Sequence, residues 1–369
     1  MMRAPKSFAI VVRRRDGSLF VRERGMVDER RGIAKLPLVR GVASLVESLK
    51  LGSEALRFSA DQMERDIDAA ERADAASAAS KVKTAGLHAL RALGLIVFAL
   101  TTTDDPASAS TAATEKKKTS GTMWLMLVMV IGFFIALPQA AAAGINRVFH
   151  FGLDVQSPGF QAITGLLKLT IVVGYLTLIR RIPDIRRVFQ YHGAEHKTIS
   201  TYEAQEALTV ANARTKTTLH PRCGTTFLVM VALVSILMFT AVGSFLPRIQ
   251  TGNAFLDNVV FFLEKLPFLP VLAAITFELQ RVFARYCTTG PLRALLWPGF
   301  LVQKITTIEP DDDQLEVALG SLRATLFRQE SADASDGSGP RETSDDVAFA
   351  SYGALLEAST LRPAMKQAA

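Results

Sequence analysis

Four long apolar stretches alternate with charged segments along this chain of 369 residues. Each has about 20 residues, and a helix of that length rises about 30 Å, the thickness of the hydrocarbon core of a bilayer. The fourth stretch is the least regular, because Glu264, Lys265 and two prolines fall inside it. We therefore predict transmembrane helices over residues 122–143, 160–179, 225–246 and 259–277.

The pattern before these stretches predicts a small soluble unit. Apolar and polar residues alternate on both sides of Asp16-Gly17, a dipeptide that favours a hairpin turn. We predict two short strands, over residues 7–14 and 18–22, followed by a surface helix with apolar residues at helical spacing. A shorter apolar run, residues 87–100, would span only about 21 Å, so we interpret it as an interfacial helix or hairpin arm.

The fold class that follows is mainly α. We expect a polytopic membrane helical bundle of about four transmembrane helices, with a small N-terminal β-hairpin and a cytoplasmic loop subdomain. The predicted parts are a cytoplasmic N-terminal region (1–60), a linker or insertion (61–121), the membrane domain (122–322) with its cytoplasmic motif loop (180–224), and a disordered tail (323–369). The tail is rich in Ser, Asp, Gly and Ala, which is typical of disorder.

Charge predicts the orientation of the bundle. The chain has 42 Lys+Arg against 35 Asp+Glu, a net charge of +7, and its basic residues gather before the first stretch, in the motif loop and after the fourth stretch. Cytoplasmic loops carry such an excess, so we predict that both termini are cytoplasmic. We expect the basic runs to contact lipid headgroups, with no nucleic-acid partner. Two cysteines cannot make a disulfide framework and suit a reducing compartment, and we expect no cleavable secretory signal.

The motif loop holds the residues that point to chemistry. In HGAEH, His192 and His196 are four residues apart, a spacing at which one helix face offers two metal ligands. Glu195 completes the pattern H-x-x-E-H of inverzincin metallopeptidases. His220 and Cys223, in HPRC, would complete the shell of a divalent metal such as zinc. The open alternatives are a polar cluster without metal and, for Cys223, a simple packing role.

Several longer motifs occur together: YHGAEHKTISTYEA, HPRCGTTFL, ITFELQRV and PGFLVQKITTIEPDDDQLEVA, with KSFAIVVRRRDGSL and LVRGVASLVESLKLGSEAL near the start. They resemble the YqhQ-like bacterial membrane proteins, a family classified as domain of unknown function 1385. The resemblance implies a multi-pass protein of the bacterial cytoplasmic (inner) membrane, described as a predicted metal-dependent enzyme. The polar positions that it carries over are His192, Glu195, His196, Glu203, His220, Arg222, Cys223, Glu278 and Arg281.

Two departures from the family pattern are expected to matter. Members usually carry a Gly-rich segment with an acidic residue before the Met-Met-Arg that opens this sequence, and we interpret its absence as a displaced start or a truncation. Residues 61–120 are longer than the family pattern, and we interpret them as an insertion.

The leading hypothesis is a membrane-embedded metal-dependent enzyme, a hydrolase of a peptide or lipid-linked substrate, with its site at the cytoplasmic face. The three motif-loop histidines and Cys223 would hold the metal. Glu195 would act as general base, and Arg222 or Arg281 would stabilise developing negative charge.

Two other functions remain open. The first alternative is a non-enzymatic membrane scaffold or assembly factor, in which a structural metal or the polar cluster fastens the loop to the bundle. The second is a small transporter with a path lined by Lys168, Glu264 and Lys265. Four helices without an inverted repeat would need a homo-oligomer to build such a path.

Overall fold

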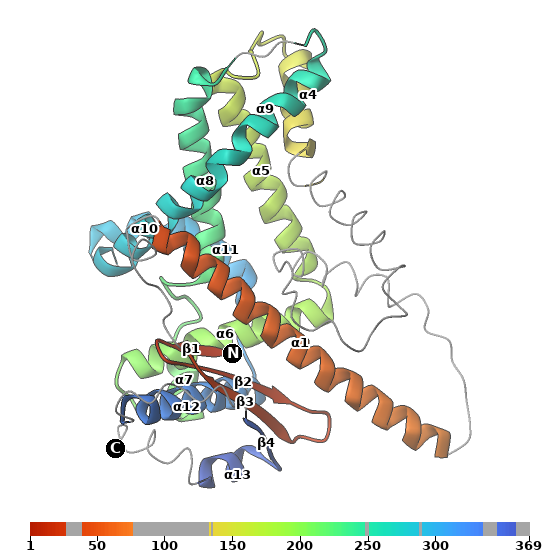
Figure 1. The fold of residues 1–369 in the computed structure, drawn as a ribbon, viewed down its shortest axis with the longest axis vertical. Coiled ribbons are helices and arrows are strands. Elements are labelled where there is room, and N and C mark those ends of the chain that lie inside the picture. Colours follow the sequence, from red (N-terminus) through yellow and green to blue (C-terminus); the bar gives the residue numbers. More distant parts are fainter. Residues whose placement is uncertain are drawn as a thin grey trace.

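The computed structural model describes residues 1–26, 39–76, 133, 136–247, 251–287, 290–334 and 345–358. Within these ranges the protein is mainly helical and has one small antiparallel sheet, which confirms the predicted class. Figure 1 shows a helical bundle at one end of the molecule and the sheet with its covering helices at the other.

The sheet contains four strands in the order β1-β2-β3-β4, all antiparallel to their neighbours. The predicted hairpin is confirmed, because β2 pairs with β3 across a turn at Asp16 and Gly17. Gly17 has a φ of 86°, a conformation that suits glycine, and Asp16 Oδ1 accepts a hydrogen bond from the Ser18 backbone N–H at 2.9 Å. The strands are β1 (Met2–Ala4), β2 (Ser7–Arg13), β3 (Leu19–Gly25) and β4 (Asp345–Phe349).

Both faces of this sheet are covered by helices. Side chains alternate along a strand, so Phe8 and Ile10 pack on one face against α1 (Val39–Ala76). Ala9 and Val11 pack on the other face against α12 (Asp312–Ala334). The opposite side of α12 packs against α6 (Pro183–Glu203) and α7 (Val210–Thr215), which fixes the motif helix α6 to the sheet.

Among the described residues, three helical segments are long and apolar enough to cross a membrane, by length and composition: Pro158–Ile179, Gly224–Val242 and Val259–Tyr286. They correspond to three of the four predicted spans. The bundle elements are α4 (Leu137–Val148), α5 (Pro158–Ile179), α8 (Gly224–Val242), η3 (Gly243–Phe245), α9 (Ala254–Lys265), η4 (Leu266–Phe268) and α10 (Leu269–Tyr286).

Two predicted segments lie mostly or wholly outside the described residues. These are the first span, 122–143, of which α4 contains only the last part, and the apolar run 87–100. The predicted linker from residue 61 differs at its start, because α1 continues as one helix to Ala76.

The C-terminal region differs from the disorder that its composition predicts. Helix α12 continues to Ala334, β4 joins the sheet beside β3, and α13 (Tyr352–Glu357) follows it. Arg22 of β3 binds Asp346 of β4 through two hydrogen bonds of 2.7 Å, and the side chain of Leu355 is fully buried. The polar composition of the tail did not predict β4 and α13, because few apolar residues are needed to attach one edge strand and one short helix.

A long helix and a short helical segment connect the two ends of the molecule. Arg40, at the start of α1, donates two hydrogen bonds to Glu278 of α10, at 2.7 and 2.6 Å. The chain after α10 forms η5 (Pro291–Leu296) and α11 (Trp297–Thr306), which lies beside α8 (Figure 1). Glu278, one of the polar positions that the family resemblance carries over, is therefore engaged by α1.

Candidate metal and active site

The motif loop forms the helices α6 and α7, followed by a short segment that leads into the candidate span α8. Pro183 occupies the first turn of α6, where its missing N–H costs no hydrogen bond. His192 and His196 lie on one face of α6, as their spacing predicts, with ring centroids 4.5 Å apart. Cys223 is the N-cap of α8, and its Sγ accepts a hydrogen bond from the Thr225 N–H at 3.4 Å.

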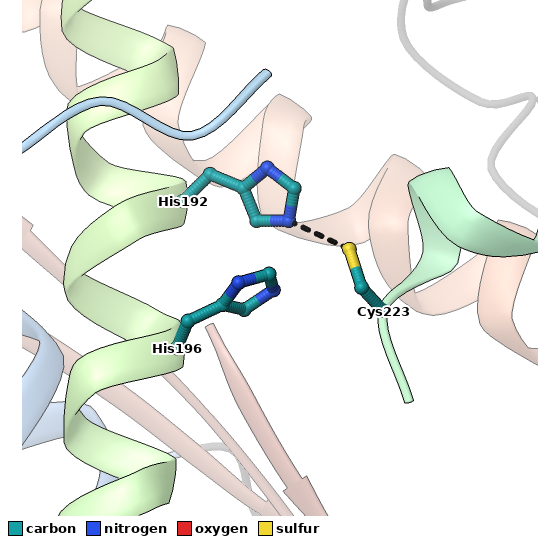
Figure 2. Close-up of side chains that lie close together, drawn as sticks. All are labelled: His192, His196 and Cys223. Atoms are coloured by element: carbon teal, nitrogen blue, oxygen red, sulfur yellow. Dashed lines mark hydrogen bonds between the residues drawn. The ribbon is translucent and has the colours of Figure 1, made fainter. Parts of the chain in front are cut away.

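These three side chains meet at one point, and we call them the His/Cys cluster. Figure 2 shows both histidines pointing from α6 toward Cys223. One ligand atom from each of the three residues lies within 4.8 Å of the others, and His192 Nε2 is 3.1 Å from Cys223 Sγ. His196 and Cys223 are buried and His192 is half-buried.

Backbone carbonyls orient both imidazoles of the cluster. His192 Nδ1 donates to the Thr306 carbonyl oxygen at 3.0 Å, and His196 Nδ1 donates to the Thr218 carbonyl oxygen. Each ring therefore keeps Nε2 available on the side of Cys223. Histidines that bind metals usually donate their other ring N–H in this way.

The donor set of the cluster fits a divalent metal. Two imidazole nitrogens and one thiolate suit zinc, and three protein ligands with a free position are typical of catalytic zinc sites. Burial, the largest single influence, would lower the pKa of His192, but the hydrogen bond to Cys223, the nearby negative charges of Cys223 and Glu195 and the bond to the Thr306 carbonyl together raise that pKa. Burial alone would raise the pKa of Cys223, but hydrogen bonds from His192 and His196 lower it. The thiol is therefore poised to be the thiolate that a metal requires.

A close approach of two chain segments builds this arrangement. The N–H of Ile308 donates to the Phe189 carbonyl oxygen at 3.0 Å, so the chain after α11 crosses α6 next to His192. A Cβ at Gly193 would lie 2.2 Å from the Ile308 carbonyl oxygen. Gly193 thus permits the crossing that brings the Thr306 carbonyl to His192.

His220 lies beside the cluster but has other partners. Its Nδ1 accepts a hydrogen bond from the Arg222 N–H at 3.3 Å, and its Nε2 donates to Glu203 Oε2 at 3.2 Å. Glu203 Oε1 also accepts a hydrogen bond from Arg222 NH1 at 2.9 Å. We call His220, Glu203 and Arg222 the Glu203 network; both ring nitrogens of His220 are engaged within it.

Buried Gln303 of α11 holds the loop that contains His220. Its side-chain oxygen accepts a hydrogen bond from the His220 N–H at 2.8 Å, and its Nε2 donates to the His220 carbonyl at 2.7 Å and to Thr226 Oγ1 at 2.5 Å. Gln303, Thr306 and Gly193 are not among the predicted site residues. The signal available for the first two was the segment PGFLVQKITTIEP, which carried the family resemblance but no predicted chemistry.

A cavity of about 320 Å³ contains most of the predicted site residues. This volume lies in the range of small-molecule sites, about 300–1,000 Å³. Glu195 lies on the cavity wall, where its Oε1 accepts a hydrogen bond from the Met1 amino group at 2.7 Å. Arg281 is exposed on α10 and is not among the residues that line the cavity, which are His192, Glu195, His196, Ile199, Glu203, His220, Arg222, Cys223 and Gly224.

Fold and site together define a helical protein with three candidate membrane spans and a His/Cys cluster at the start of one of them. Residues 36–328 match the model of a protein family of unknown function, DUF1385, and because this is well over half of the chain, the chain belongs to that family. It is similar to the uncharacterized protein YqhQ of Bacillus subtilis (strain 168), with 28% identity over 324 residues that cover 86% of each chain. No solved structure matches the chain.

Proposed function

We propose that this protein is a membrane-embedded metal-dependent hydrolase with its site at the cytoplasmic face. One observation carries the proposal: His192 and His196 each donate Nδ1–H to a backbone carbonyl and turn Nε2 toward the Cys223 thiol. A pair of histidines with only a packing role does not need two fixed tautomers that converge on a thiolate.

The residues of the site divide into ligands and reacting groups. His192, His196 and Cys223 would hold the divalent metal, zinc by the donor set, and such an ion acts as a Lewis acid that polarises substrate and water. Glu195 is our general base, because it lies on the cavity wall directly before His196 in the H-x-x-E-H pattern. Arg222, 65% exposed in its side chain, would stabilise negative charge on the substrate.

The sheet supports the predicted orientation of the bundle. The first 25 residues and β4 pair in one sheet, so they lie on the same side of any membrane that the spans cross. The three candidate spans among the described residues, together with the span predicted over residues 122–143, would give the even number of crossings that this pairing requires. Arg180 and Arg181 follow the end of α5 on the sheet side, which favours a cytoplasmic sheet. Reporter fusions at residue 369 and in the α4–α5 loop would test this orientation.

The metal content of the purified full chain tests the core of the proposal. The detergent-solubilised protein should contain about one zinc, iron or manganese ion per chain, as a single three-ligand site implies. His192→Ala and Cys223→Ser should each remove the ion. His150→Ala, which removes an exposed histidine of the α4–α5 loop, is the matched control and should keep it. Absence of metal from protein purified under reducing conditions without chelator contradicts the proposal.

A second candidate function is a non-enzymatic scaffold with a structural metal. The observation in its favour is that the ligands come from α6, which packs on the sheet unit, and from the start of the span α8. A metal there would also fasten the two parts of the molecule together.

Glu195→Gln distinguishes the two candidates. In a hydrolase this variant keeps its metal and its thermal stability but loses turnover, by about 100-fold or more for loss of a general base. In a scaffold this variant also keeps its metal, and neither it nor the wild type shows turnover. The transporter hypothesis has weaker support, because Lys265 donates to Gln161 Oε1 at 2.7 Å and lies over the Phe261 ring within the bundle.

A further inference from the structure

An apolar surface lies next to the cavity, on η5 and α11. Four large apolar side chains, Leu292, Leu295, Trp297 and Leu301, have between 46% and 54% of their surface exposed. The opposite side of α11 is buried and includes Gly299, which packs so closely on α8 that a Cβ there would lie 2.4 Å from Thr226. The segment therefore has one face fixed to the bundle and leaves apolar side chains exposed on the other.

Contacts with two candidate spans, α5 and α8, fix the depth of this surface relative to a membrane. Arg180, directly after the end of α5, donates a hydrogen bond to the Lys304 carbonyl at 2.6 Å. Gln303 donates to Thr226, in the first turn of α8. Helix α11 is thus attached to the residue that follows one candidate span and to the first turn of another, which is the expected position of the membrane boundary.

The composition of the surface suits a headgroup layer. Trp is enriched at membrane interfaces, and amphipathic helices with basic residues beside an apolar face lie in that layer. Arg293 lies 5.9 Å from the Phe300 ring centre, and Lys304 lies 6.0 Å from that of Trp297. Lys304 thus lies beside the exposed Trp297, and Arg293 directly follows the exposed Leu292 in the chain.

The cavity lies at the same depth as this surface. The last helical residue of α11, Thr306, supplies the carbonyl that binds His192, and Cys223 directly precedes the first residue of α8. The cavity wall is mostly polar, with Ile199 as its large aliphatic side chain. A molecule anchored in the bilayer would therefore present its polar end, and not its apolar chain, to the His/Cys cluster.

We propose that η5 and α11 lie in the headgroup layer and that the substrate of the site is a lipid-linked molecule, with its apolar part in the bilayer and its polar group in the cavity. The substrate class rests on the proposed hydrolase function. The position of α11 does not, because it follows from its contacts with α5 and α8.

Tryptophan fluorescence measures the depth of α11 directly. The chain has two tryptophans, so Trp124→Phe leaves Trp297 as the single emitter. In nanodiscs, lipids brominated near the headgroup end of the acyl chain should remove more than half of the Trp297 emission, as expected for a residue at the interface, while aqueous iodide removes little. Quenching by iodide and not by brominated lipid would place α11 in water and overturn the proposal.

Photo-crosslinking then tests access to the cavity. The probe is phosphatidylglycerol with a diazirine beside its headgroup, in nanodiscs with the full chain. Labels are expected on Leu301 and on Ile199, while Val347 of β4, an apolar residue with 41% exposure, is the unlabelled control. Labelling of Leu301 without Ile199 overturns the lipid-linked substrate. Labelling of both in a protein that contains no metal retains lipid access and instead contradicts the hydrolase.

Discussion

Two histidine-containing groups share one cavity wall, and their hydrogen bonds give them different chemistry. In the His/Cys cluster, each imidazole uses Nδ1 on a carbonyl and keeps Nε2 toward Cys223. In the Glu203 network, His220 uses one nitrogen toward Arg222 and the other toward Glu203. Residue type and spacing do not distinguish the two groups. They differ in the partner of Nε2, which is the Cys223 thiol in the cluster and the Glu203 carboxylate in the network.

The largest expected effect is on metal affinity. It is measured by substituting two histidines, His196 and His220, whose ring centroids are 5.8 Å apart. His196→Ala should weaken zinc binding by more than about 100-fold, because it removes a proposed ligand and not merely a neighbour of one. His220→Ala should weaken it by less than about 10-fold. Competition with a chromophoric zinc chelator measures both. Equal losses would place His220 among the ligands and remove the distinction between the two groups.

The next effect concerns the chain crossing that orients His192. Gly193→Ala places a methyl group where only 2.2 Å separates it from the Ile308 carbonyl oxygen, so α6 or the Ile308 segment must move. We expect a loss of as much as about 3 kcal/mol in unfolding free energy, together with weaker metal binding. Thermal unfolding of the detergent-solubilised protein measures the first quantity.

Gly174→Ala is the matched control for this substitution. Gly174 is also helical, in α5, and a Cβ there would meet no atom within 4 Å. The control should be neutral or slightly stabilising, because alanine favours a helix over glycine by about 1 kcal/mol. Equal behaviour of the two variants would contradict the role of Gly193.

A smaller effect should separate the Glu203 network from the His/Cys cluster. Gln303→Ala removes three hydrogen bonds and leaves the buried backbone of His220 without these partners, a loss of about 2 kcal/mol. Metal content should persist, because Gln303 contacts no member of the cluster in the described hydrogen bonds. Gln190→Ala, whose amide forms longer hydrogen bonds of 3.3 and 3.4 Å, should lower the unfolding temperature less. If Gln303→Ala lost its metal and Gln190→Ala kept it, the Glu203 network and the His/Cys cluster would have to be treated as one structural unit.

Part of this architecture could be predicted from the sequence because it depends on local patterns of residues. Long apolar runs predicted the three described spans, Asp16-Gly17 predicted the hairpin, and the i, i+4 spacing placed His192 and His196 on one helix face. Each of these signals lies within about 25 residues of sequence, the length of one helix or hairpin.

The remainder depends on contacts between distant segments. The pairing of β4 with β3 joins residues more than 300 positions apart, and the Thr306 carbonyl reaches His192 across 114 positions. A backbone carbonyl has no residue signature, so the tautomer of His192 could not be predicted from sequence. The hydrogen bond between His220 and Glu203 likewise depends on the path of the loop, which has no local sequence signal. Sequence alone therefore could not separate His220 from the proposed metal ligands.

The smallest effect is the pH dependence that His220 contributes to stability. Burial lowers the pKa of His220 below its ordinary value of 6.5, in spite of the hydrogen bond to Glu203 that raises it. Between these two pKa values the unfolded chain binds more protons than the folded one, so stability falls as the pH falls below 6.5. His220→Gln removes this contribution, so the difference in unfolding temperature between wild type and variant should shrink from pH 7 toward pH 5. A difference that grows as the pH falls would mean that His220 gains its proton on folding. The pair with Glu203 would then be an ion pair, and the Glu203 network would depend on charge rather than on neutral hydrogen bonds.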